Sequence, residues 1–195
     1  NSVLESAIKL DLEHENYDLT TSVKMYESLK TSGNNKYQYV LPSYNFSKNF
    51  SLKNIEGGFN FNSNGSNNLS NSNVFKSSVS NYLEYSTLDT FFDNGIKTNF
   101  NVSLTNTNIV AKNSSQYKNS LQSDLISAYT YNASFPLTKK KSNSINTLEP
   151  KLSLRFSPHK MSDNSSGYNR IDISNVFSNG RLGIEEGESI TLGIN

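Results

Sequence analysis

The chain has 195 residues, of which 34% are hydrophobic and 18% are charged, and its net charge is +1. This hydrophobic share is low for a globular protein with a dry core, yet the 11 Phe and 11 Tyr residues differ from the composition of a disordered chain. Cys is absent, which excludes a disulfide scaffold, a thiolate metal site and a Cys nucleophile, and no apolar stretch approaches the roughly 20 residues of a membrane-spanning helix.

Apolar and polar residues alternate along most of the chain, which is the pattern of β-strands with one apolar and one polar face. We expect roughly nine or ten strands in total, and residues 106–123 are the segment where the alternation is poor. We expect polar turns between the strands, and Asp93-Asn94-Gly95 is a strong hairpin signal. In chain order the clearest runs are 19–27, 37–41, 55–61, 79–85, 96–104, 127–137 and 148–156, and the expected turns are 31–35, 62–68, 93–95 and 139–143.

The expected strands are long. Their runs of about 9–14 residues exceed the usual five or six of globular strands and approach the 9–11 that cross a bilayer at a tilt. A soluble β-sandwich also alternates, but a second sheet must cover its apolar face. We therefore expect an all-β, antiparallel up-and-down meander that is part of a transmembrane outer-membrane β-barrel, with aromatic residues such as Tyr44, Phe46 and Phe59 at the membrane interfaces.

The ends of the sequence indicate a piece of a longer protein. The chain starts at Asn1 without an initiator Met or a signal peptide, and it stops inside an alternating run at Asn195. We therefore expect residues 1–195 to be one partial outer-membrane β-barrel domain.

Residues that carry chemistry do not converge in the sequence. Alternation places His14 on the opposite face from Glu13 and Glu15, and the second histidine, His159, is remote. No nucleophile elbow and no phosphate-binding glycine loop occurs. We expect no enzyme, no catalytic or metal-binding residues, no cofactor, and no nucleic-acid partner, since Lys139–Lys141 reads as a solvated turn in a nearly neutral chain.

The C-terminal quarter contains an ordered set of strand and turn residues. A strand opens with Glu149-Pro150, closes on an aromatic residue and Pro158, and leads through a long loop to a strand with Gly187, Thr191 and Gly193. This order resembles the barrel of the lipopolysaccharide-assembly protein LptD (OstA) family, although Gly180 and Leu182 replace the family's common Asn and Phe. The residues that match the family pattern in order are Pro150, Pro158, Asp172, Phe177, Arg181, Gly183, Gly187, Thr191 and Gly193.

This resemblance implies a translocon in the bacterial outer membrane that inserts lipopolysaccharide into the outer leaflet without making or breaking a bond. Its implied partners are lipopolysaccharide, outer-membrane lipid, an LptE-like lipoprotein plug and periplasmic bridge proteins that deliver lipopolysaccharide. The implied motif loop contains Asp172, Phe177, Arg181, Gly183 and Gly187.

The polar residues that alternation places on the lumen side near this motif are candidates for contact with a sugar-phosphate headgroup. They are Glu149, Lys151, Ser153 and Arg155. The same polarity is also expected of any wide, wet lumen. Two alternatives stay open: a general porin-like barrel, and a soluble β-sheet module of the adhesin type. Pro150 lacks an N–H, so we expect it at a bulge or where no donor is needed.

Overall fold

The computed structural model describes residues 2–70, 73–142, 144–158 and 187–194. These residues form strands and one 3-10 turn, η1 (Gly33–Lys36). The strands are β1 (Val3–His14), β2 (Tyr17–Ser28), β3 (Tyr37–Leu52), β4 (Ile55–Ser70), β5 (Val74–Ser86), β6 (Thr90–Phe91), β7 (Lys97–Lys112), β8 (Gln122–Ser134), β9 (Leu137–Lys141), β10 (Ser144–Leu148), β11 (Pro150–Ser157) and β12 (Gly187–Ile194).

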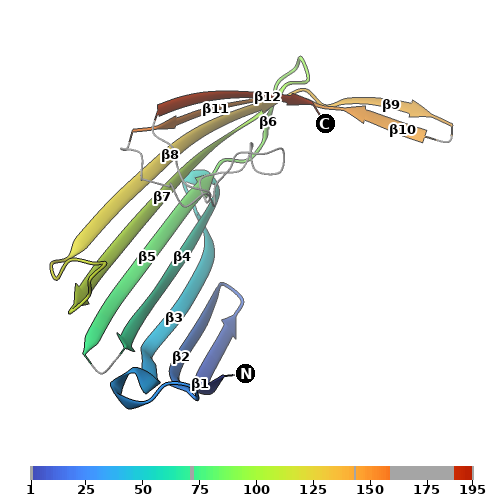
Figure 1. The fold of residues 1–195 in the computed structure, drawn as a ribbon. Coiled ribbons are helices and arrows are strands. Elements are labelled where there is room, and N and C mark those ends of the chain that lie inside the picture. The colour runs from blue at the N-terminus through green and yellow to red at the C-terminus, as the bar shows by residue number, and fades with distance from the viewer. Residues whose placement is uncertain (1, 71–72, 143, 159–186, 195) are drawn as a thin grey trace. The chain divides into compact units, whose positions relative to one another are not determined.

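The strands form one large antiparallel sheet and one small one (Figure 1). The large sheet has ten strands in the order β1-β2-β3-β4-β5-β7-β8-β11-β12, with β6 paired to β7. Strands β9 and β10 pair only with each other among the described residues. The prediction of an all-β antiparallel meander of nine or ten strands is therefore confirmed.

Chain contacts divide the protein into two compact units. Unit 1 contains residues 1–50, 60–83 and 105–125, and unit 2 contains residues 51–59, 84–104 and 126–195.

In unit 1 the register of β1 and β2 separates apolar from polar side chains. Ile8 pairs with Val23 and Leu12 pairs with Leu19, which puts all four on one face. On the other face the ammonium of Lys24 lies 3.2 Å from the carboxylate of Glu5. The predicted division into one apolar and one wet face is thus present in these strands.

One predicted turn is wrong and another is shorter than predicted. Residues 62–68 belong to β4. Lys139–Lys141, the first part of the predicted 139–143 turn, belong to β9, and the chain reverses after them, because Lys141 pairs with Ser144 of β10. In β4 the polar side chains bond to one another along one face, as Asn68 does to Ser66 over 3.0 Å, so asparagine and serine have local partners without a turn. Pairing with neighbouring strands overrides the turn preference of these residues.

Other local predictions are confirmed. The Asp93-Asn94-Gly95 hairpin closes β6 onto β7, with the Phe92 N–H donating to the Ile96 carbonyl over 2.9 Å and Gly95 at a φ of 83°. Pro150 is the first residue of β11, a position where a strand tolerates proline, and its carbonyl accepts the N–H of Phe135 at 3.0 Å.

Burial is inverted relative to an ordinary globular protein. Among the described residues the only buried hydrophobic side chains are Ala111 and Ala128. Ile8 and Leu192, by contrast, are 78% and 77% exposed. The buried polar residues are Ser22, Ser63, Thr98, Asn101, Ser103, Ser127, Thr130, Ser153 and Ser157. The described sheet therefore has no conventional apolar core.

Gly57 in unit 2 provides a test of the local fold. Its φ is 118°, and a Cβ added there would overlap the backbone carbonyl oxygen of Ser86. We expect Gly57→Ala to lower the free energy of unfolding by about 1–3 kcal/mol, as measured by urea unfolding followed by circular dichroism. Gly58→Ala is the matched control, because a Cβ on Gly58 meets no atom within 4 Å. Equal stability of the two variants would contradict this local geometry.

Candidate functional site

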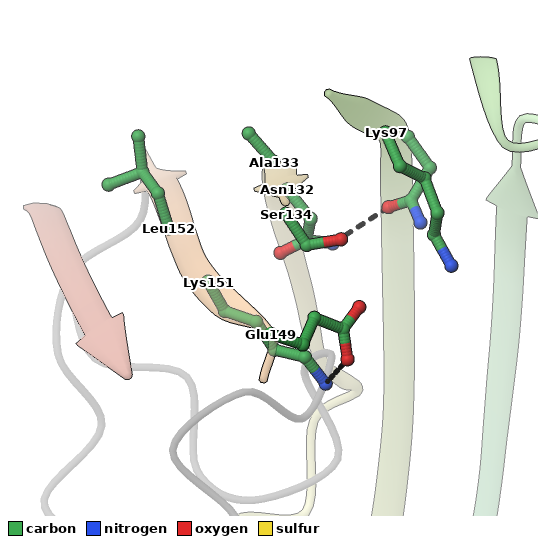
Figure 2. A pocket seen from close by; sticks show the side chains of 8 residues that line it. Lys97, Asn132, Ala133, Ser134, Glu149, Lys151 and Leu152 are labelled. Atoms are coloured by element: carbon green, nitrogen blue, oxygen red, sulfur yellow. Dashed lines mark hydrogen bonds and ion pairs between the residues drawn. The ribbon is translucent and has the colours of Figure 1, made fainter. Parts of the chain in front are cut away.

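A cavity of about 200 Å³ lies on unit 2, where β7, β8 and β11 come together (Figure 2). It is lined by Lys97, Asn99, Asn132, Ala133, Ser134, Glu149, Lys151 and Leu152. Of the predicted polar candidates, Glu149 and Lys151 line the cavity, whereas Ser153 and Arg155 are not among its lining residues.

Strand register brings the polar lining residues together. Lys151 pairs with Ser134 and Ser153 pairs with Asn132, so their side chains share one face of the β8–β11 pair. The amide of Asn132 donates to the side-chain oxygen of Asn99 over 2.9 Å, which extends this face to β7. Arg155 pairs with Thr130 on the same face, farther along β11. Ser153 is 6% exposed and is covered within the sheet.

One ion pair stands at the β7 side of the cavity. The ammonium of Lys97 lies 3.0 Å from the carboxylate of Asp89, and the amide of Asn99 donates to the same carboxylate over 2.9 Å. The hydrogen bonds from Asn99 and Lys97 hold the pKa of Asp89 below its ordinary value. Asp89 therefore remains a carboxylate through the neutral range and neutralises one of the two lysines.

A second ion pair stands at the start of β11. The carboxylate of Glu149 lies 3.2 Å from the ammonium of Lys151, and Figure 2 shows the two side chains in contact. Burial raises the pKa of Glu149. Hydrogen bonds from Ser134 and Lys151 and the positive charges of Lys151 and Lys97 together outweigh burial, so the pKa lies below its ordinary value. The cavity thus holds two lysines, each paired with a carboxylate, together with neutral amides.

Sequence reasoning missed the lining residues on β7 and β8. Lys97, Asn99 and Asn132 stand on the polar side of their strands, which the alternation of residues indicates. Their proximity to Lys151, however, depends on the pairing of β8 with β11 across the β9–β10 hairpin. The period of two assigns residues to a face and does not say which strands are neighbours.

The family-motif loop is only partly described. Asp172, Phe177, Arg181 and Gly183 lie outside the described residues, and their proposed role stays a prediction. Gly187 begins β12 and pairs with Ser157.

Metal binding has no candidate site among the described residues. They contain no group of three or more His, Cys, Asp or Glu side chains placed to hold a metal ion. The ring of His14 stacks on Tyr17 with a centroid distance of 4.7 Å. The arrangement around the cavity offers hydrogen bonds and paired charges to a polar ligand.

Comparison with known protein families gives no match, and comparison with curated protein sequences gives none either. Within the described residues, no helix has the length and apolar character needed to cross a membrane.

The ion pair between Glu149 and Lys151 leads to a prediction about the pKa of Glu149. We expect Lys151→Met to raise the pKa of Glu149, because burial then acts with one opposing donor fewer. Carboxyl NMR titration measures this change, and Lys140→Met, in the separate β9 strand, should leave the pKa of Glu149 unchanged.

The same pair affects stability with a defined sign. Folding lowers the pKa of Glu149, so the pair stabilises the fold above the ordinary pKa of a glutamate and loses this effect as pH falls through the lowered value. The stability difference between wild type and Lys151→Met, under about 1 kcal/mol for a surface pair, should therefore shrink in acid. A difference that grows on acidification would contradict the assignment.

Proposed function

We propose that this chain forms part of the wall of a β-barrel in the bacterial outer membrane, with its apolar face against lipid and its polar face toward a wet lumen. The observation that carries the proposal is the inverted burial: large apolar side chains are exposed while small polar side chains are buried. A lipid environment solvates the exposed apolar face, and a lumen requires the polar one.

Strand length supports the same proposal. Strands β3, β4 and β7 have 16 residues each, and β5 and β8 have 13. At about 3.3 Å per residue and a tilt near 40°, 13 to 16 residues rise by roughly 33–40 Å, more than the ~25 Å apolar band of such barrels. Each of these strands is therefore long enough to cross a bilayer.

The finer proposal is transport of lipopolysaccharide by a translocon of the LptD type. It is supported by the ordered resemblance from Pro150 to Gly193 and by the polar cavity with Lys97 and Lys151. Lysine and arginine side chains on this face, including Arg155, would meet headgroup phosphates through charge-assisted hydrogen bonds. The proposed partners are lipopolysaccharide, outer-membrane lipid, an LptE-like plug and periplasmic bridge proteins.

The two alternatives have different consequences. A porin-like barrel shares the lipid-facing surface and differs in passing small solutes. A soluble adhesin-like sheet would leave side chains such as Ile190, Leu192 and Ile194, each at least 72% exposed, in water. Contiguous apolar surface of this kind in a soluble protein indicates an interaction face.

An arginine substitution on the apolar face tests whether that face contacts lipid or water. Leu192→Arg in the full chain should impair membrane assembly, because arginine facing lipid costs about 2–4 kcal/mol near the bilayer midplane. Thr191→Arg is the matched control, because its side chain points to the opposite face of β12. The measurement is the amount of folded protein in the outer-membrane fraction.

The outcome separates the proposals. Loss of assembly in Leu192→Arg with normal assembly in Thr191→Arg supports a lipid-facing surface. Normal assembly of both variants, or release of wild type into the soluble fraction without detergent, would contradict a membrane barrel.

Charge reversal tests the finer proposal. We expect Lys151→Glu and Arg155→Glu to slow lipopolysaccharide delivery to the cell surface while the barrel still assembles, because each variant replaces a cation with a group that repels phosphate. Lys112→Glu, at the exposed end of β7, serves as the control for a change in net charge. Unchanged delivery in both test variants would discard their contact with lipopolysaccharide.

A further inference from the structure

A row of polar side chains crosses four neighbouring strands of unit 1, and we call it the polar belt. It consists of Tyr44 on β3, Ser63 on β4, Asn81 on β5 and Asn106 on β7. The Tyr44 and Ser63 hydroxyls share a hydrogen bond of 3.0 Å, and Ser63 donates to the side-chain oxygen of Asn81 over 2.8 Å. Asn81 donates to the side-chain oxygen of Asn106 over 3.5 Å, and Asn106 donates to the carbonyl of Asp124 over 3.2 Å.

The polar belt lies on the apolar face of the sheet. Phe46 is two residues from Tyr44 and Phe61 is two residues from Ser63, so alternation puts each pair on one face. The rings of Phe46 and Phe61 contact each other with centroids 6.1 Å apart, as their neighbours Tyr44 and Ser63 do. The belt therefore places polar side chains directly beside the aromatic rings of Phe46 and Phe61.

The packing of neighbouring residues holds the belt in place. Ser63 is only 8% exposed, although it lies on the apolar face of the sheet. Gly65, two residues farther along β4, leaves room for the ring of Tyr44, which a Cβ at this position would meet at 2.5 Å. The missing side chain lets the tyrosine lie across β4 and bring its hydroxyl to Ser63.

The face differs on the two sides of the belt. Between the belt and the β3–β4 turn, the face of β4 carries Phe61, Phe59 and Ile55, without a polar side chain. On β3 the same stretch includes one cation, Lys48, which lies over the ring of Phe50 at 5.9 Å. Beyond the belt, polar residues return: Asn67 follows Gly65 on β4 before Leu69, and Ser77 separates Val79 from Phe75 on β5.

The length of the apolar stretch matches a membrane. From Ile55 to Ser63 there are eight residue steps, about 26 Å along the strand, or roughly 20 Å along the membrane normal at a tilt near 40°. The apolar band of an outer-membrane barrel is about 25 Å tall. The belt thus stands at one edge of such a band, where polar groups that satisfy each other can also bond to water and headgroups.

We infer that the polar belt marks the level at which this chain leaves the hydrocarbon and meets the lipid headgroup layer. The strand ends beyond the belt then project into headgroups and water. This inference rests on the proposed membrane function and assigns the membrane boundary to particular residues.

Cysteine labelling tests the inference, since the sequence contains no Cys. Single cysteines are placed in the full chain on the same face at Phe61 or Leu83, inside the proposed boundary, and at Leu69 or Phe75, outside it. Opened cell envelopes are treated with a charged maleimide that reaches both membrane surfaces. The two pairs on different strands keep the test valid if one variant does not fold, and the parent chain gives the background.

We expect Phe61→Cys and Leu83→Cys to react about tenfold more slowly than Leu69→Cys and Phe75→Cys, because hydrocarbon excludes a charged reagent. All four should react alike after denaturation. Slow labelling at all four positions in the membrane would overturn the boundary and leave the membrane proposal intact. Fast labelling at all four would overturn the membrane proposal itself.

Discussion

Backbone pairing in a β-sheet satisfies the main-chain groups and leaves the side chains alone to determine what each face contacts. In this chain the side chains alternate so that Leu12 and Leu19 pair on one face while Asp11 and Thr20 bond on the other. The described residues supply no second layer to bury the apolar face. This constraint motivates the proposed membrane location, in which lipid would cover the apolar face.

The polar face follows from the same alternation and shows how a wet surface is organised. Small residues such as Ser103, Thr130 and Ser153 are buried between larger neighbours, and amides bond from strand to strand, as Asn132 does to Asn99. Charged groups occur in pairs at the cavity, so neither Lys97 nor Lys151 lacks a counter-ion. A polar ligand would therefore bind by replacing the carboxylate partners of these lysines, as a headgroup phosphate can do through charge-assisted hydrogen bonds.

Much of the fold can be predicted from the period of two, and the failures have a common cause. Alternation predicts that Lys151, Ser153 and Arg155 share a face, and the register of β11 with β8 places them so. Alternation does not predict that β4 continues through Asn62–Asn68, because asparagine and serine favour turns. These residues lie in a strand here, where their side chains form hydrogen bonds with one another. The cavity and the polar belt depend on which strands pair, and a single strand's pattern contains no information on its neighbours.

We propose that one face of this sheet contacts lipid and that the other contacts water. Photolabelling of native outer membranes with a lipid-soluble carbene reagent, followed by peptide mass spectrometry, tests this proposal. We expect labels with a period of two, on residues such as Tyr131, Leu154 and Leu192 and not on Asn132, Ser153 or Thr191. Labels on adjacent residues without this period, or no labels in these strands, would contradict it.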